Sequence, residues 1–135
     1  MVFTMNDLIF LFGLFLAFEL FESNWQKSDT LYGVIDNNYK IYKKSIYLFI
    51  VMNPTFFYAI YVAMKLNNFG FMMSSIIVLK FLDISFRLSI MNKIENNQSI
   101  KHILPIDIKM DGIMQYLNII LYLPIFGYVL YTIGQ

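Results

Sequence analysis

The sequence contains no cysteine and a single histidine, His102. The absence of cysteine excludes disulfides, thiolate nucleophiles and cysteine-based metal sites, and one histidine excludes haem ligation by two histidines of this chain. Nucleophile motifs, glycine-rich phosphate-binding loops and metal-ligand pairs are also missing. We therefore expect no catalytic residues, no cofactor and no metal site. The formal net charge of +1 gives no electrostatic reason to expect a nucleic-acid partner.

Charged residues are scarce as well, at 14% of the chain against roughly 25% in ordinary soluble domains. Hydrophobic residues make up 59%, and the mean hydropathy is +0.60. They concentrate in four segments, each long enough to span a bilayer as a helix. The segments predict an all-α, polytopic membrane protein with one domain over residues 1–135, an antiparallel bundle of four transmembrane helices at about 5–25, 45–64, 69–91 and 111–133.

The first segment lacks the basic start and the cleavage site of a signal peptide, so we expect it to remain in the mature protein as a helix. Prolines interrupt two later segments: Asn53-Pro54 lies near the middle of the second, and Pro124 lies in the fourth. Proline removes a backbone donor and clashes with the carbonyl four residues earlier. Helix kinks are therefore expected at Asn53, Pro54 and Pro124.

Two polar connections, residues 26–44 and 92–110, join these segments. In the first, Tyr32, Ile35 and Tyr39 recur at spacings of three and four, which predicts an amphipathic helix. It lies either on the membrane surface or against the ends of the bundle's own helices. In the second connection, apolar and polar residues alternate from Ile106 to Met110, which predicts an extended piece against the membrane or a partner.

Lysines are distributed unevenly between the two sides of the predicted bundle. The opposite side holds Lys65 alone, whereas the two long connections hold Lys27, Lys40, Lys43, Lys44, Lys93, Lys101 and Lys109. Positively charged loops face the cytoplasm in most membrane proteins. We therefore expect both termini outside and the connections 26–44 and 92–110 in the cytoplasm, where either could contact a partner. The expected location is a bacterial inner (plasma) membrane, with membrane lipid around the helices.

The third segment carries three charges on one helical stripe, because Lys80, Asp83 and Arg87 stand at positions i, i+3 and i+7. A charge within a bilayer costs at least about 2.5–3.5 kcal/mol, so these side chains need partners. Glu19 and Glu22 in the first segment are the nearest candidates. Glu19 and Lys80 fall at matched depths, about 18–20 Å from the outer start of their helices at 1.5 Å per residue.

The expected ion pairs are Glu19–Lys80, Glu22–Arg87 and, within the third segment, Asp83–Arg87. Three acids against two bases leave one acid without a full partner, and such an acid has a raised pKa in a site of low polarity. The cluster is therefore either a proton or cation site or a set of contacts that holds the bundle together.

Two functions follow from this reading. The first is an accessory or interaction subunit of a membrane complex, in which the charge cluster joins helices and the chain forms a homo- or hetero-oligomer. The alternative is an oligomeric ion or proton channel or transporter that uses Glu19, Lys80 and Asp83. The absence of a recognisable selectivity filter favours the first.

Overall fold

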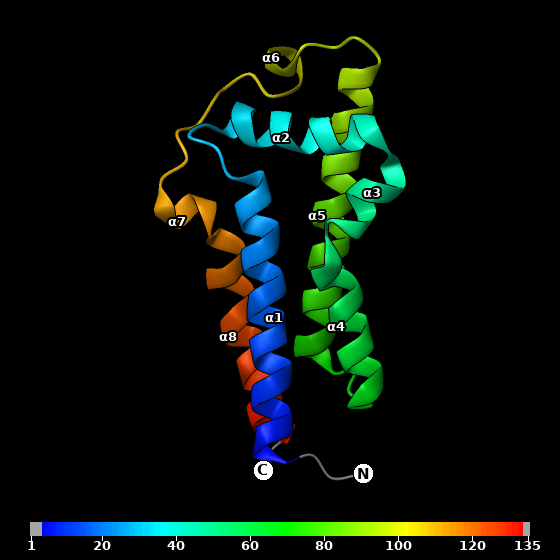
Figure 1. Cartoon of the computed structure of the whole chain (residues 1–135), viewed down its shortest axis with the longest axis vertical. Helices are drawn as coiled ribbons and strands as arrows, with labels where there is room; N and C mark the ends of the chain where they lie inside the picture. The colour runs from blue at the N-terminus through cyan, green and yellow to red at the C-terminus, as the bar shows by residue number, and fades with distance from the viewer. Residues whose placement is uncertain (1–3, 134–135) are drawn as a thin grey trace.

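The computed structural model describes residues 4–133, and over that range the chain forms eight α-helices (Figure 1). Four of them build a bundle: α1 (Met5–Gln26), α4 (Pro54–Lys65), α5 (Phe71–Glu95) and α8 (Leu117–Ile133). The others lie at or near one end of it: α2 (Leu31–Lys44), α3 (Ile46–Val51), α6 (Ile100–Ile103) and α7 (Gly112–Gln115).

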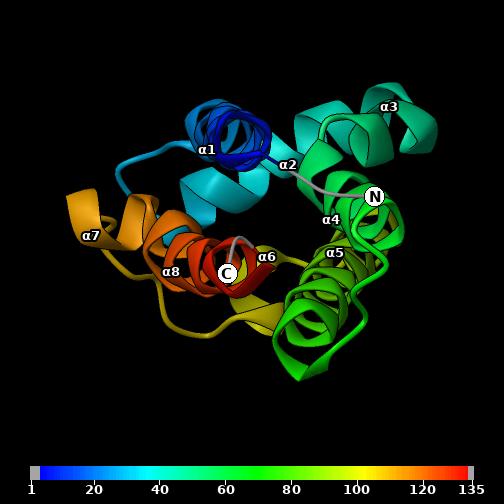
Figure 2. The same ribbon diagram turned by 90° about the horizontal axis from the view of Figure 1, so that it is seen from below.

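The four bundle helices pack in a ring, in which α1 contacts α8 and α4, and α5 contacts the same two helices from the other side. Figure 2 looks along this bundle. Its core is aromatic: the rings of Phe15 and Phe126 stack at 4.2 Å between centroids, and Phe15 also lies 6.4 Å from the ring of Tyr58. The buried Ala59 and Ala63, one turn apart on α4, leave room for these large side chains.

Helix α2 lies across one end of the bundle (Figure 1). It begins because the Thr30 hydroxyl accepts a hydrogen bond from the Gly33 N–H, a standard N-terminal cap. Its apolar stripe faces inward, where Ile35 packs with Ile90 and Met91 of α5. The amphipathic stripe therefore packs against the chain's own helix ends.

The alternating stretch from Ile106 to Met110 also contacts its own chain. Thr30 and Lys109 form an isolated antiparallel β-bridge. The Leu31 N–H donates to the Ile108 carbonyl and the Met110 N–H donates to the Asp29 carbonyl, both at 2.7 Å. This extended piece thereby fixes the start of α2.

The prediction of four membrane-spanning helices is wrong. Among the helices of residues 4–133, none combines the length and the apolar character that a bilayer crossing requires. The second segment is divided at Asn53-Pro54 into helices of 6 and 12 residues, and the fourth is divided at Tyr116 into helices of 4 and 17 residues. The longer α1 and α5 hold acids and bases within their length: Asp7, Glu19 and Glu22 in α1, and Lys80, Asp83, Arg87, Lys93 and Glu95 in α5.

This finding also overturns the predictions that depended on membrane-spanning helices. The transmembrane domain, the location in a bacterial inner membrane, the outward termini and the cytoplasmic placement of residues 26–44 and 92–110 all required helices that cross the bilayer. These predictions failed because the mean hydropathy of a whole segment averages over the short polar interruptions within it. In the folded chain those interruptions end a helix or place charged side chains inside one.

The prolines act differently at their two places. Asn53 leaves the helical region with φ −119° and ψ 66°, and Pro54 becomes the first residue of α4. A proline is well suited to that position because its missing N–H would have no helical partner there. Pro124, in contrast, lies inside α8, which continues past it to Ile133.

Candidate functional site

The centre of the bundle holds an ion pair between Glu19 of α1 and Lys80 of α5. Their side chains are 0% and 6% exposed, so the pair is removed from solvent. The two helices face each other across the ring, and the pair bridges them through the core. Burial raises the pKa of the Glu19 carboxyl, and the Lys80 ammonium opposes that rise.

Aromatic rings enclose the Lys80 ammonium. Its nitrogen lies 4.2 Å from the ring centroid of Tyr122 on α8 and 5.9 Å from that of Phe15 on α1. A cation over an aromatic face is stabilised by the ring's quadrupole, more strongly when water is absent. Burial and the nearby acids raise the pKa of Tyr122 to about 12, so its hydroxyl stays neutral. Lys80 thus contacts the opposite helix α1 and the neighbouring helix α8 besides its own.

Glu22, one turn further along α1, caps a helix. Its Oε2 accepts a hydrogen bond of 3.0 Å from the backbone N–H of Thr55, the second residue of α4. Asn53 occupies the capping position by sequence but makes no capping bond with its side chain. The first N–H groups of a helix lack internal partners and carry partial positive charge, so a carboxylate is favourable there. Burial nevertheless raises the pKa of Glu22 to about 7.

Arg87 of α5 is the hub of the polar cluster. Its Nη1 donates to Gln26 Oε1 at 3.1 Å and to Asn38 Oδ1 at 3.0 Å. Its Nη2 donates to Asn53 Oδ1 at 2.8 Å and to Asp83 Oδ2 at 2.9 Å. One guanidinium therefore joins the end of α1, the middle of α2, the break between α3 and α4, and α5 itself.

Further hydrogen bonds fix the amides that Arg87 uses. The Asn38 amide nitrogen donates to Gln26 Oε1 at 3.2 Å and to the Val34 carbonyl at 2.8 Å. The Asn53 amide nitrogen donates to the Phe49 carbonyl at 2.8 Å, and the guanidinium carbon of Arg87 lies 5.5 Å from the Phe49 ring centroid. Both amides thus turn their oxygens toward the guanidinium. We call Glu19, Glu22, Lys80, Asp83, Arg87 and the three amides of Gln26, Asn38 and Asn53 the charge cluster.

The structure brings together most of the residues that the sequence singled out. Glu19 lies against Lys80, and Asp83 lies against Arg87. Glu22 does not bond to Arg87; it bonds to the start of α4. With Glu19 and Asp83 each beside a cation, Glu22 is the acid in excess, and its charge is offset by a backbone N–H.

Sequence reasoning missed Gln26 and Asn38 as members of the cluster, as well as the ring of Tyr122. A signal for Asn38 exists: it follows Ile35 by three residues on α2, so it shares the buried face of that helix. His102 lies outside the cluster on an exposed part of the chain. Within residues 4–133, no group of three or more histidine, aspartate and glutamate side chains is placed to hold a metal ion.

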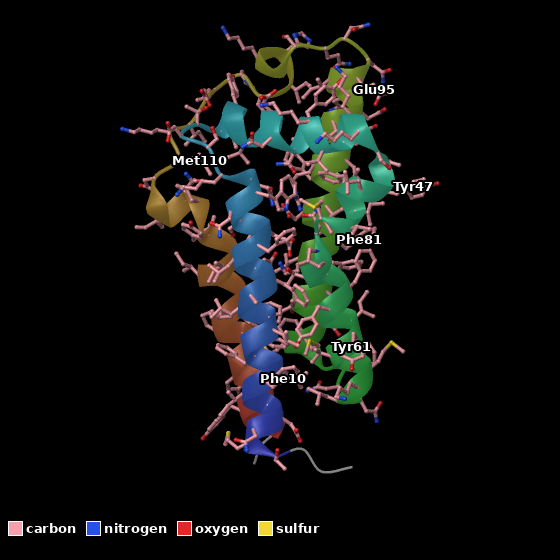
Figure 3. All side chains as sticks on the ribbon, in the orientation of Figure 1. Phe10, Tyr47, Tyr61, Phe81, Glu95 and Met110 are labelled. Atoms are coloured by element: carbon pink, nitrogen blue, oxygen red, sulfur yellow. The ribbon has the colours of Figure 1, made fainter. Side chains whose placement is uncertain are left out.

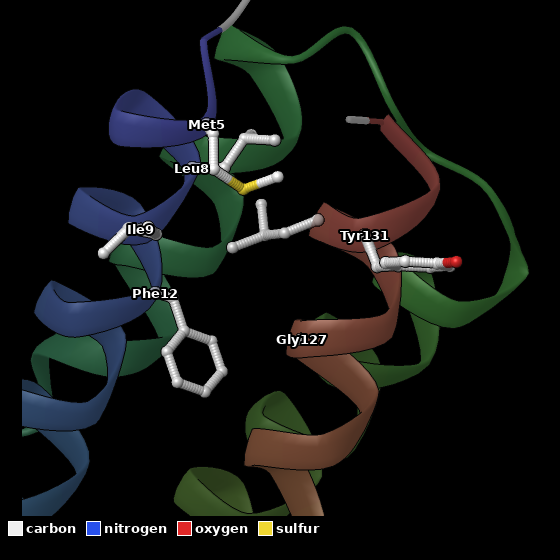
Figure 4. Close-up of a pocket in the computed structure, with 7 residues that line it drawn as sticks. Met5, Leu8, Ile9, Phe12, Gly127 and Tyr131 are labelled. Carbon is white, nitrogen blue, oxygen red and sulfur yellow. The ribbon is translucent and has the colours of Figure 1, made fainter. Parts of the chain in front are cut away.

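An apolar cavity of about 480 Å³ lies between α1 and α8, near the start of α1 (Figure 4). Leu8 and Phe12 line it from α1, and Gly127 and Leu130 line it from α8. A Cβ on Gly127 would lie 3.2 Å from the Phe12 ring, so glycine permits the close approach of the helices here. No aspartate, glutamate, lysine, arginine or histidine is among its lining residues, so it is chemically separate from the charge cluster.

Comparison with known proteins supplies no relative from which to transfer a function: no protein-family model, no curated protein and no solved structure matches this chain. The geometry of the charge cluster and of the surface therefore carries the functional argument.

Proposed function

We propose that this chain is a helical interaction subunit, which assembles with other protein through apolar outer faces of its helices. The observation that supports this most is the number of large apolar side chains left exposed on the outside of the bundle. Figure 3 labels several of them on different helices. They include Phe10 on α1, Tyr47 on α3, Tyr61 on α4 and Phe81 on α5.

Helix α5 illustrates the point. Its inward face buries Ile76 and Met91, while Phe81, Leu82 and Phe86 on other faces are more than half exposed. A helix with large apolar residues on its outer face as well as its inner one is normally covered on both. Contiguous apolar surface beyond a few hundred Å² marks an interaction site on most proteins. The outer face of α5 therefore favours a partner that covers it.

The charge cluster has a structural part in this proposal. Buried ionic and polar groups can fix one arrangement of helices among several apolar alternatives. Arg87 alone reaches three other segments, and Glu22 holds the start of α4. A bundle with apolar residues inside and outside needs such contacts, because hydrophobicity does not distinguish its two sides.

The alternative of an ion or proton pathway has less support. Glu19 and Lys80 are paired with each other, and the Asp83 carboxylate accepts from Arg87. The residues that were expected to carry ions are thus engaged within the chain, which favours the structural role.

The proposed function is tested by measuring the mass of the assembly that the chain forms when it is extracted without denaturant. A single chain has a mass of 16.0 kDa. We expect sedimentation or native mass spectrometry to give an assembly of higher mass, made of several copies or of this chain with another protein. A folded monomer at every concentration tested, with no other protein bound, would contradict the proposal.

A further inference from the structure

One apolar patch is continuous across α4 and α5. The ring of the exposed Phe57 lies 5.3 Å from the ring of Phe56, and Phe56 lies 6.1 Å from the ring of the exposed Phe81. Phe56 therefore links the two helices with an unbroken row of aromatic rings. Phe57 is 49% exposed and Phe81 is 55% exposed, so about half of the surface of each residue remains accessible to solvent.

The patch extends along both helices from this row. On α4 the exposed residues recur at spacings of four and three, so they share one outward face. On α5, Phe71, Val78, Leu82 and Phe86 follow the same helical repeat, and Phe81 lies beside this stripe on the side of Phe56. We define the α4–α5 face by its exposed members: Phe57, Tyr61, Met64, Phe71, Val78, Phe81, Leu82 and Phe86. None of these residues is charged, and Lys65 lies at one rim, its ammonium 5.9 Å from the Tyr61 ring centroid.

The size of the face fits a protein interface. Aromatic side chains have areas of about 150–250 Å², so the five aromatic members, 49–85% exposed, leave roughly 600 Å² together. The aliphatic members and Met64 bring the exposed apolar area to about 800 Å². A standard interface buries about 800 Å² on each partner. The largest apolar patch on an ordinary monomer is about 300–600 Å². The α4–α5 face is therefore larger than a monomer normally leaves open and large enough for a stable dimer.

We propose that a second copy of this chain covers the α4–α5 face, with the two copies related by a two-fold axis that passes near Leu82. This inference rests on the proposed function and names its partner. An uncharged, aromatic face has no charge pattern that would require a different protein, and it is complementary to itself. A two-fold arrangement covers the same face on both copies and leaves neither exposed.

Cross-linking provides a direct test, because the chain contains no cysteine. In a two-fold interface a residue near the axis meets its own counterpart. Leu82→Cys should therefore give a covalent dimer under mild oxidation, since a disulfide requires the two Cα atoms to lie within about 7 Å. Leu121→Cys on α8 is the matched control, because Leu82 is 55% exposed and Leu121 is 47% exposed.

A charged substitution provides the second test. Phe81→Glu places a charge in the middle of the α4–α5 face, and we expect it to weaken the dimer at least about 30-fold, the effect of losing a central anchor residue. Phe10→Glu on α1, at a phenylalanine outside this face that is 66% exposed against 55% for Phe81, should leave the dimer intact. Circular dichroism of both variants checks that they fold like the wild type.

The outcomes separate this inference from the proposed function. A wild-type dimer that cross-links through Leu82→Cys and dissociates with Phe81→Glu supports both. A dimer that cross-links through Leu121→Cys instead, or that ignores Phe81→Glu, overturns the α4–α5 inference and keeps the proposed function. A wild type that binds a different protein through this face, and never itself, has the same consequence. A monomer without any partner overturns both.

Discussion

The acid that caps α4 should make the stability of this protein depend on pH in an unusual direction. Glu22 is buried, 5% exposed, and its carboxylate accepts a hydrogen bond from the backbone N–H of Thr55. Its pKa is raised from 4.5 to about 7, chiefly by burial, with the Glu19 charge adding to the rise and the Lys80 charge opposing it. The folded state therefore holds a proton on Glu22 at pH values where the unfolded state does not.

The sign and size of the effect follow from that difference. Below pH 4.5 both states are protonated at Glu22, so the folded protein carries no buried excess charge. As the pH rises from 4.5 to about 7, folding requires Glu22 to keep a proton or to bury its charge, and stability is lost. A rise of this size corresponds to about 3 kcal/mol of unfolding free energy. Glu19, whose pKa is also raised, changes stability in the same direction.

Glu22→Gln isolates the contribution of this residue, because glutamine is neutral at all pH values and its carbonyl can still accept the Thr55 N–H. Urea unfolding, followed by circular dichroism, should show the variant gaining about 3 kcal/mol over the wild type between pH 4.5 and pH 8. Asp36→Asn, at a carboxylate that is 61% exposed, is the control and should shift little. Parallel stability curves for Glu22→Gln and the wild type would refute the reasoning.

Two further predictions concern the hub and the start of α2. Arg87→Lys should lower the unfolding free energy by about 2–4 kcal/mol, since an ammonium cannot reach the four acceptors that the guanidinium serves. Denaturant titration measures this change. An unchanged midpoint would contradict the role of Arg87 as the hub of the cluster. Gly33→Ala should lose about 1–3 kcal/mol, because its Cβ would lie 1.9 Å from the Ser28 Oγ and 2.7 Å from the Ser28 Cβ. Gly13→Ala, where a Cβ meets nothing within 4 Å inside α1, should instead gain about 0.4–1 kcal/mol. Denaturant titration measures both alanine variants, and equal effects of the two would be inconsistent with this packing.

The sequence predicted the positions of the long helices because each is an unbroken run of compatible residues. The first segment, about 5–25, matches α1 (Met5–Gln26), and the third, about 69–91, matches α5 (Phe71–Glu95) to within a few residues. It did not predict what surrounds them. Apolar residues on every face are expected both for a bilayer span and for a helix covered by protein, and composition does not separate these cases.

The charge cluster was predictable where helix geometry alone decides the contact. A rise of 1.5 Å per residue gave Glu19 and Lys80 equal heights, and they are in contact in the folded chain. The assignment of Glu22 to Arg87 matched charges by sign and overlooked a backbone donor, the Thr55 N–H, which the break at Asn53 exposes.

Gln26 and Asn38 are a different case. Each lies in a polar stretch of sequence that is normally solvated. Gln26 bonds to Arg87 from the end of α1, and Asn38 bonds to Arg87 because α2 lies across the bundle end. The placement of α2 is accompanied by the bridge between Thr30 and Lys109, a contact between segments 79 residues apart in the numbering. The local pattern of polar and apolar residues in the sequence contains no information on such a contact.

The central claim, that a buried ion pair joins opposite helices of the bundle, is tested most directly by a double-mutant cycle on Glu19 and Lys80. Lys80→Met leaves a carboxylate that is 0% exposed without its cation, and removing one partner of a buried pair costs about 3–5 kcal/mol. Glu19→Gln combined with Lys80→Met should recover most of that loss, giving a coupling energy above about 2 kcal/mol. The exposed pair Asp36–Lys40, with side chains 61% and 68% exposed, should couple by less than about 1 kcal/mol in the same assay. Equal coupling energies for the two pairs would contradict the account.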